Sequence, residues 1–199
     1  MTRFAGPFLI CVLAVASGCS APGQTKTEAE AASQAATTQA PPEIQAVAAT
    51  LLGSGAAVLA FGDLAHNGRD QAFVADRLVD APESGGQGAS FTRAAILQRE
   101  GTKWSEVLRC DEYLKNPAGY LGGAPVAPTT GWRVEFDRSG KDKGREFLFT
   151  PLRAAGETPM STITVRWNPS VNRYQALDHE NGHFLGEAPS LETPTSPLR

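Results

Sequence analysis

The amino-acid sequence predicts a mainly β fold, an antiparallel sandwich or a curled sheet of about eight strands, with a short helix at its N-terminal end. Short runs with alternating or apolar side chains recur from residue 56 to residue 178, separated by turn-forming residues such as glycine, asparagine and proline. These runs form two groups of four, which a proline- and glycine-rich passage over 116–131 separates. Residues 44–62 carry no charge, but their glycines and polar residues favour a helix, a glycine stop and a buried strand over a membrane span.

Residues 1–18 have the organisation of a secretory signal peptide. Arg3 supplies a positive charge, and an apolar run follows from Phe4. The run is too short for a comfortable membrane span, and it ends in small residues directly before Cys19. The sequence therefore predicts an exported protein.

The end of this signal, Ala16-Ser17-Gly18-Cys19, resembles the lipobox of bacterial lipoprotein precursors, with Ala16 at a position where leucine is more usual. The resemblance implies that the Cys19 thiol is diacylated, that the signal is removed after Gly18, and that the new amino terminus can be acylated too. Each buried methylene adds about 0.8 kcal/mol, so two or three acyl chains would hold the protein firmly at a membrane. Ser20 does not resemble an inner-membrane retention signal, which implies outer-membrane sorting if the source is Gram-negative. The alternative is a plain secretory signal that happens to contain a cysteine.

Composition divides the rest of the chain into three parts. Residues 19–42 contain no aromatic residue and no aliphatic residue larger than alanine, which predicts a lipidated, disordered tether. Residues 43–188 are predicted to form a single mainly β domain, long enough to bury about two-thirds of its unfolded surface. Residues 189–199 contain three prolines and are predicted to be a disordered tail.

The predicted helix opens the domain. The prolines at 41–42 stand at its start, where a missing N–H donor does no harm, and Gly53 ends it. Its apolar face is predicted to consist of Ile44, Val47 and Leu51.

Eight strands follow in two groups. The first four are predicted at 56–62, 71–79, 91–99 and 103–110, and the second four at 132–137, 145–152, 161–167 and 173–178. The groups look alike, which suggests a degenerate duplication of a four-stranded antiparallel unit. Trp104 and Tyr174 would then occupy matching positions and face one shared core. Because Trp104 is in phase with Leu108, we expect its loss to be more destabilising than that of Tyr174, whose hydroxyl suggests a place near the rim.

Residues 58–74 resemble one FG-GAP (VCBS-type) repeat, the blade unit of integrin-like propellers. The resemblance implies an acidic loop that binds calcium through oxygen ligands at alternate positions. Asp63 keeps the first ligand position and Gly68 keeps the turn glycine, whereas the remaining ligand positions hold Ala65, Asn67 and Gln71. With a single carboxylate in register, the loop is predicted to keep its hairpin shape without a strong calcium site. Two units are also too few for a closed propeller.

Residues 179–183, HENGH, spell the H-E-x-x-H signature of zinc peptidases. Such an enzyme holds both histidines on one helix and needs a third protein ligand. The Asn-Gly pair in the middle is instead a strong turn signal, and glycine costs about 1 kcal/mol inside a helix. Pro189 stands where the metzincin pattern would place a third histidine. The sequence therefore predicts a polar turn, and a zinc hydrolase that uses His179, Glu180 and His183 is the alternative.

The remaining features predict a binding protein. Cys110 follows an alternating strand pattern and is predicted to be a buried core thiol. The net charge of −3 gives no reason to expect nucleic acid, and the sequence has neither a nucleophile elbow nor a phosphate-binding glycine loop. We therefore predict a non-enzymatic, lipid-anchored protein of the bacterial cell envelope that acts by binding or structural contact and uses no cofactor. Its expected partner is another envelope protein or a cell-wall glycan; a calcium-stabilised adhesive module is a further alternative.

The lipid anchor is directly testable. Substitution of Cys19 by alanine removes the thiol that would be acylated, so Cys19→Ala should abolish incorporation of radiolabelled palmitate and release the protein into a soluble fraction. Palmitate labelling that survives the substitution would contradict the lipoprotein prediction.

Overall fold

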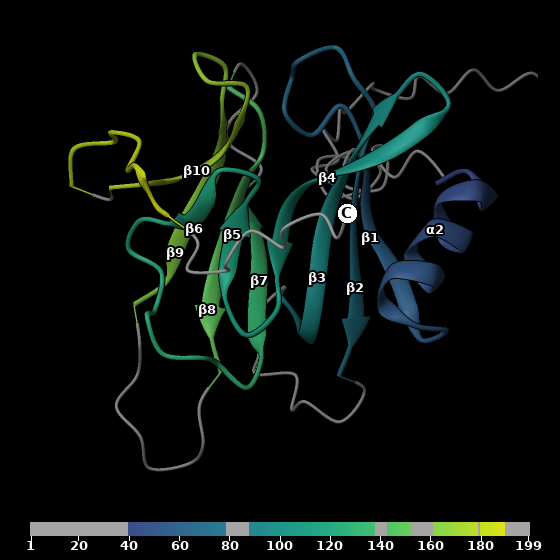
Figure 1. Ribbon diagram of the computed structural model, residues 1–199, viewed down its shortest axis with the longest axis horizontal. Coiled ribbons are helices and arrows are strands. Elements are labelled where there is room, and N and C mark those ends of the chain that lie inside the picture. The colour runs from purple at the N-terminus through teal and green to yellow at the C-terminus, as the bar shows by residue number, and fades with distance from the viewer. Residues whose placement is uncertain (1–39, 79–87, 138–142, 153–160, 179, 190–199) are drawn as a thin grey trace, which may run out of the picture. The chain divides into compact units, whose positions relative to one another are not determined.

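Among the described residues, eleven antiparallel strands form one curled sheet, and a helix packs on the face of that sheet opposite its main core (Figure 1). The computed structural model describes residues 40–78, 88–137, 143–152, 161–178 and 180–189. The expected signal peptide, Cys19, most of the tether and the tail from residue 190 lie outside the described residues. The elements are α2 (Pro42–Leu52), β1 (Ala56–Gly62), β2 (Gln71–Arg77), β3 (Ala89–Glu100), β4 (Lys103–Cys110), β5 (Leu114–Asn116), β6 (Gly119–Leu121), β7 (Trp132–Asp137), β8 (Glu146–Pro151), β9 (Ile163–Asn168), β10 (Arg173–Leu177) and β11 (Glu187–Ala188).

The eight predicted strands form two four-stranded antiparallel meanders, β1–β4 and β7–β10. The 12-residue strand β3 joins them, because Ala94–Glu100 pair with β4 while Ala89–Phe91 pair with β7. The mainly β fold, the curled sheet and the short helix are therefore confirmed. Since β3 belongs to both meanders, the described strands make one sheet rather than the two layers of a sandwich. Three strands of at most three residues, β5, β6 and β11, extend the sheet beyond β4.

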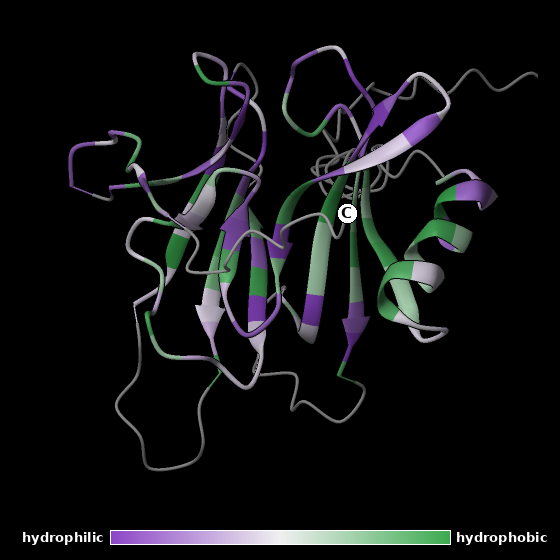
Figure 2. Cartoon of the chain, viewed as in Figure 1, coloured by the Kyte–Doolittle hydropathy of each residue, from purple (hydrophilic) through white to green (hydrophobic). Residues whose placement is uncertain are grey.

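The helix α2 begins at Pro42 and ends before Gly53, as the prolines and the glycine predict. Its buried positions are four residues apart, at Ile44, Ala48 and Leu52, and they pack on alanine, valine and leucine side chains of β1–β3. Val47 and Leu51 lie half-buried at the edge of this contact, so the buried face is rotated from the predicted one. Figure 2 shows the hydrophobic positions of α2 together with those of the neighbouring strands.

The main core lies on the opposite face of the sheet and is built around the fully buried ring of Phe73. Four other phenylalanine rings lie with their centroids 5.5–6.1 Å from it, those of Phe91, Phe136, Phe147 and Phe149. Their edge-to-face and tilted arrangements suit the ring quadrupoles. Strands from both meanders supply these rings, so the core holds the two halves of the sheet together.

A β-bulge at Val107 overturns the prediction for Trp104. Ile96 pairs with Leu108, but the next residue, Leu97, pairs with Glu106, so Val107 has no partner across the ladder. The bulge reverses the side-chain phase: Leu108 faces the main core, whereas Trp104 lies half-buried on the helix side. Period-two alternation alone does not reveal an inserted residue, which is why the pattern wrongly placed both side chains on one face.

Tyr174 does face the main core, and it is completely buried rather than near a rim. Its ring packs edge-on against Trp167 and Phe147, and its hydroxyl donates to Gln71 Oε1 at 2.6 Å. Gln71 in turn donates to Gln98 Oε1 at 2.9 Å, and both glutamines are buried. Burial raises the pKa of the Tyr174 hydroxyl, with Asp63 adding to the effect. This polar chain fastens β10 to β2 and β3 across the interior.

The two ends of the sheet meet at Glu187 of β11, whose side chain is 9% exposed. Arg173 of β10 donates to its Oε1 at 2.6 Å, and Gln175 donates to the same oxygen at 2.9 Å. Asn116 of β5 donates to Glu187 at 2.9 Å and to the backbone oxygen of Tyr174 at 2.7 Å. Side chains thus close the curl where β10 and β5 share no backbone ladder among the described residues.

The burial of the two aromatics predicts the relative cost of their removal. Tyr174→Ala should destabilise the fold by about 3–5 kcal/mol, as expected for a large buried side chain. Trp104→Ala, at a half-buried site, should cost about 1–2 kcal/mol. Urea unfolding of both variants measures the difference in their free energies of unfolding. Tyr174→Phe isolates the hydrogen bond of the hydroxyl, and its loss should cost about 1–3 kcal/mol because Gln71 Oε1 loses its donor. A larger cost for Trp104→Ala than for Tyr174→Ala would contradict the assignment of their faces.

The closure at Glu187 should be sensitive to acid. The hydrogen bond from Arg173, followed by those from Asn116 and Gln175, lowers the pKa of Glu187 from 4.5 to about 2 against the opposing effect of burial. A carboxyl group whose pKa is lower in the folded state than in the unfolded state stabilises the fold at pH values above the unfolded-state pKa. This stabilisation is lost as the pH falls from the unfolded-state pKa towards the folded-state pKa. We expect Glu187→Gln to lower the free energy of unfolding by on the order of 2 kcal/mol at neutral pH.

The pH dependence separates this effect from a general loss of packing. The difference between the original protein and Glu187→Gln should shrink as pH falls from about 4.5 towards about 2, because the unfolded chain takes up a proton at Glu187 in this range while the folded protein still holds the ionised carboxylate. Glu112→Gln is the matched control, since Glu112 is exposed and its side chain forms no ion pair with another described residue. A difference that stays constant with pH would contradict a charge-dependent closure.

Candidate functional site

Residues 180–183, the described part of the HENGH segment, lie in a turn that closes a hairpin. Leu177 and Phe184 form an antiparallel bridge, the Asp178 amide donates to His183 O at 2.8 Å, and the Gly182 amide donates to Asp178 O at 2.8 Å. Gly182 has φ 67°, which glycine adopts without strain. The predicted turn is therefore present, and the Asn-Gly pair explains it.

The carboxylate of Asp178 organises this turn. It accepts from the Glu180 amide and from Asn181 Nδ2, each at 2.9 Å. The bond from Asn181 is the largest cause that lowers the pKa of Asp178, and the charge of His183 adds to it. His183 is exposed, and His179 lies outside the described residues. Within the described ranges, no three histidine, cysteine, aspartate or glutamate side chains gather closely enough to hold a metal ion.

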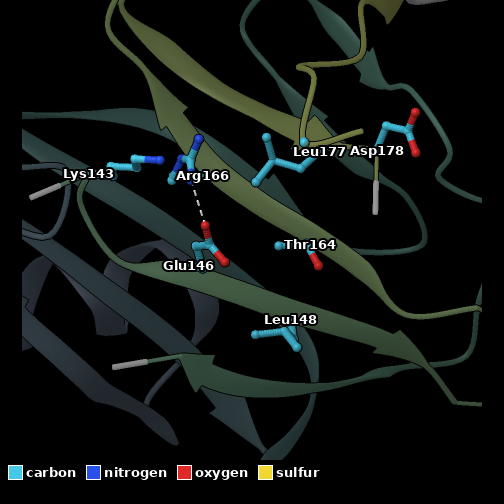
Figure 3. A pocket seen from close by; sticks show the side chains of 8 residues that line it. Lys143, Glu146, Leu148, Thr164, Arg166, Leu177 and Asp178 are labelled. Carbon is cyan, nitrogen blue, oxygen red and sulfur yellow. Dashed lines mark hydrogen bonds and ion pairs between the residues drawn. The ribbon is translucent and has the colours of Figure 1, made fainter. Parts of the chain in front are cut away.

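A cleft of about 360 Å³ lies beside the hairpin (Figure 3). Asp178 and Gly182 form its hairpin side. The outer faces of β8, β9 and β10, with the turn before β8, contribute Lys143, Glu146, Leu148, Thr164, Arg166 and Leu177. The HENGH turn therefore borders a cleft with both polar and apolar walls. Its resemblance to a zinc motif does not indicate this position.

A second cleft, of about 770 Å³, lies where the chain leaves β4 and returns to β7. We call it the tyrosine cleft, because the rings of Tyr113 and Tyr120 meet edge-to-face in its wall with centroids 5.3 Å apart. Its charged residues are Arg93, Asp111, Glu112 and Lys115, and its far side includes Pro128, Thr129 and Thr130. The sequence predicts only a connection here, because two three-residue strands flanked by proline and glycine give no periodic signal.

Hydrogen bonds fix the walls of the tyrosine cleft. The Tyr113 amide donates to Asp111 Oδ1 at 3.1 Å, while Trp132 Nε1 donates to Asp111 O at 2.6 Å. The Thr129 amide donates to Glu112 O at 2.9 Å, which ties the returning segment to the tyrosine wall. Because Trp132 is completely buried in the main core, the cleft is anchored to the rigid part of the molecule.

The loop that resembles an FG-GAP repeat has the predicted hairpin shape. Asp63 accepts from the amides of Asn67 and Gly68, each at 2.9 Å, so both carboxylate oxygens bind the loop's own backbone. Asn67 Nδ2 donates to Gln98 Oε1 at 2.9 Å, which joins the loop to the buried glutamines. Ala65, at a ligand position that carries asparagine or aspartate in the family, is buried.

Cys110 is a buried core thiol, as its strand pattern predicts, and it is 1% exposed. Burial raises the pKa of this thiol well above its usual value, and the charge of Asp111 acts in the same direction. A thiol of this kind is inert rather than nucleophilic.

Comparison with known proteins adds no relative to these observations. No protein family, no curated protein and no solved structure matches the chain. Within the described part of the chain, no helix has both the length and the apolar character needed to cross a membrane.

Proposed function

We propose that this chain is a non-enzymatic binding protein of the bacterial cell envelope, held to a membrane by lipid on Cys19, and that it takes a cell-wall glycan in the tyrosine cleft. The lipobox resemblance supports the location. The observation that carries the ligand class is the pair of tyrosine rings in a preformed cleft of about 770 Å³ with charged and hydroxyl groups around it.

A sugar ring matches this combination of groups. Its C–H face is apolar and packs on an aromatic ring, while its hydroxyls at the rim need donors and acceptors. Tyr113 and Tyr120 are half-buried and supply the ring surfaces, and their phenols add hydrogen-bonding groups. Arg93, Lys115 and the threonines supply polar contacts within reach of the same hollow.

The rigidity of the cleft favours a ligand that binds without reorganising the protein. Lys115 Nζ lies 3.6 Å from Asp111 Oδ2, and both side chains are less than a quarter exposed. Arg93 is held by Asp76 and by the backbone oxygen of Leu52 at 2.7 Å. Groups that are already ordered lose little conformational entropy when a ligand arrives, which raises affinity for a given set of contacts.

A concave cleft also favours a glycan over a folded envelope protein. Stable protein interfaces bury about 800 Å² on each partner and centre on large apolar anchors. Among the described residues the large hydrophobic side chains that are well exposed are Leu78, Val126 and Val171, and only Val126, at 97%, is fully so. They come from three different segments and suggest no continuous apolar patch.

Removal of a cleft tyrosine tests the proposal. Tyr120→Ala should weaken co-sedimentation of the full chain with protein-free cell-wall sacculi by at least about tenfold, the usual loss when an aromatic anchor is truncated. Phe61→Ala is the matched control, because Phe61 is a half-buried aromatic that lines neither the tyrosine cleft nor the cleft beside the hairpin. Circular dichroism should show both variants folded. Sacculi that bind the original protein and Tyr120→Ala equally well, or bind neither, would overturn the proposal.

A further inference from the structure

The cleft beside the HENGH turn has a layered outer face that the glycan proposal does not use. In one layer Arg166 of β9 donates to Glu146 of β8. In the next layer Thr164 of β9 pairs with Leu148 of β8 on one side and with Leu177 of β10 on the other. Side chains two residues apart on a strand share a face, so the charged layer lies directly beside the apolar layer. Figure 3 shows Lys143 and Arg166 together at one end and Asp178 at the other.

Arg166 is held in a defined orientation at the charged end. Its Nη1 donates to Glu146 Oε1 at 2.6 Å, and its guanidinium lies over the ring of Phe184 with 5.3 Å to the centroid. Its side chain is 15% exposed. A guanidinium has five N–H donors, and the described contacts of Arg166 use one edge and one face of it. Arg166 therefore lines the cleft with a guanidinium whose orientation is already fixed.

Lys143 adds a second cation at the same end. It is exposed, and among the residues that the structure describes it has no ion-pair partner. Glu146 offsets one of the two cations, which leaves one positive charge in excess there. The negative charge of Asp178 lies at the opposite end of the cleft, where hydrogen bonds from Glu180 and Asn181 hold the carboxylate in the hairpin. The end at Lys143 and Arg166 thus matches an anion.

We propose that this cleft binds the carboxylate of a short aliphatic ligand, with the carboxylate at Lys143 and Arg166 and the alkyl group on Leu148 and Leu177. A planar carboxylate suits the fork of a guanidinium, and charge-assisted hydrogen bonds of this kind are the stronger ones. In the adjacent layer Leu148 and Leu177 flank Thr164 and supply apolar surface to the cleft. A volume of about 360 Å³ lies at the lower end of ligand cavities, which limits the ligand to one or two amino-acid residues or a small acid.

Calorimetric titration of the full chain in detergent with three probes tests this site. The probes are N-acetyl-alanyl-leucine with a free carboxylate, the same dipeptide as its C-terminal amide, and isovalerate. The free-carboxylate dipeptide should bind, and its amide should bind at least about tenfold more weakly because the charge-assisted bonds are lost. If isovalerate binds as well as the dipeptide, the ligand class is a small free acid. If only the dipeptide binds, the ligand is a peptide C-terminus. Either result supports the site.

Variants connect the binding to the named residues. Lys143→Gln should weaken the dipeptide about tenfold without a change in fold, since Lys143 is exposed; Lys103→Gln, an exposed lysine outside the cleft, should have no effect. Arg166→Gln should abolish binding, and its thermal melt shows whether the fold survives the loss of the Glu146 pair. Equal binding of the carboxylate and the amide, no binding of either at millimolar concentration, or unchanged affinity in Lys143→Gln would overturn the proposal. Tyr120→Ala should bind the dipeptide normally, so this result and the glycan result are independent.

Discussion

The closure of the curled sheet depends on one carboxylate that holds its two ends together. Glu187 belongs to a two-residue strand, yet it accepts hydrogen bonds from Arg173 and Gln175 on one end of the sheet and from Asn116 on the other. A backbone ladder between β10 and β5 would fix the register of the two strands. Three side-chain donors around the Glu187 carboxylate join the strands without that constraint. Because Asn116 also bonds the backbone of Tyr174, the closure and the most deeply buried tyrosine are parts of the same arrangement.

Bulges then decide which side chains the curl encloses. At Val107 the inserted residue sends Leu108 into the main core and Trp104 to the helix side. A second irregularity lies between β2 and β3, where Asp76 accepts from the amides of Thr92 and Arg93 at 3.0 and 2.6 Å and so satisfies the donors that the ladder leaves open. Bulges of this kind increase local twist, which a sheet needs in order to curl.

Both clefts lie on the outside of the curled sheet, where short connections cross its strands. The tyrosine cleft is walled by the passage between β4 and β7, which Trp132 and Thr129 tie to residues 111–112. The other cleft is walled by the hairpin after β10, which returns along its own strand through Leu177 and Phe184. A glycan and an aliphatic carboxylate are different chemistries, and cell-wall polymers that carry peptide side chains present both, so the two proposed sites are compatible with one partner surface.

The sequence by itself determined what depends on neighbouring residues. Local chemistry sufficed for the eight long strands, for the helix between Pro42 and Gly53, for the turn at Gly182 and for the burial of Cys110. It also supplied the lipobox resemblance at Cys19, which lies outside the described residues. Only the tertiary structure decided the rest, because it depends on contacts between distant segments: Tyr174 reaches Gln71 across 103 residues, and Asn116 reaches Glu187 across 71. The two clefts belong to this second group, since residues from three or more segments form each of them and no single stretch of sequence records their proximity.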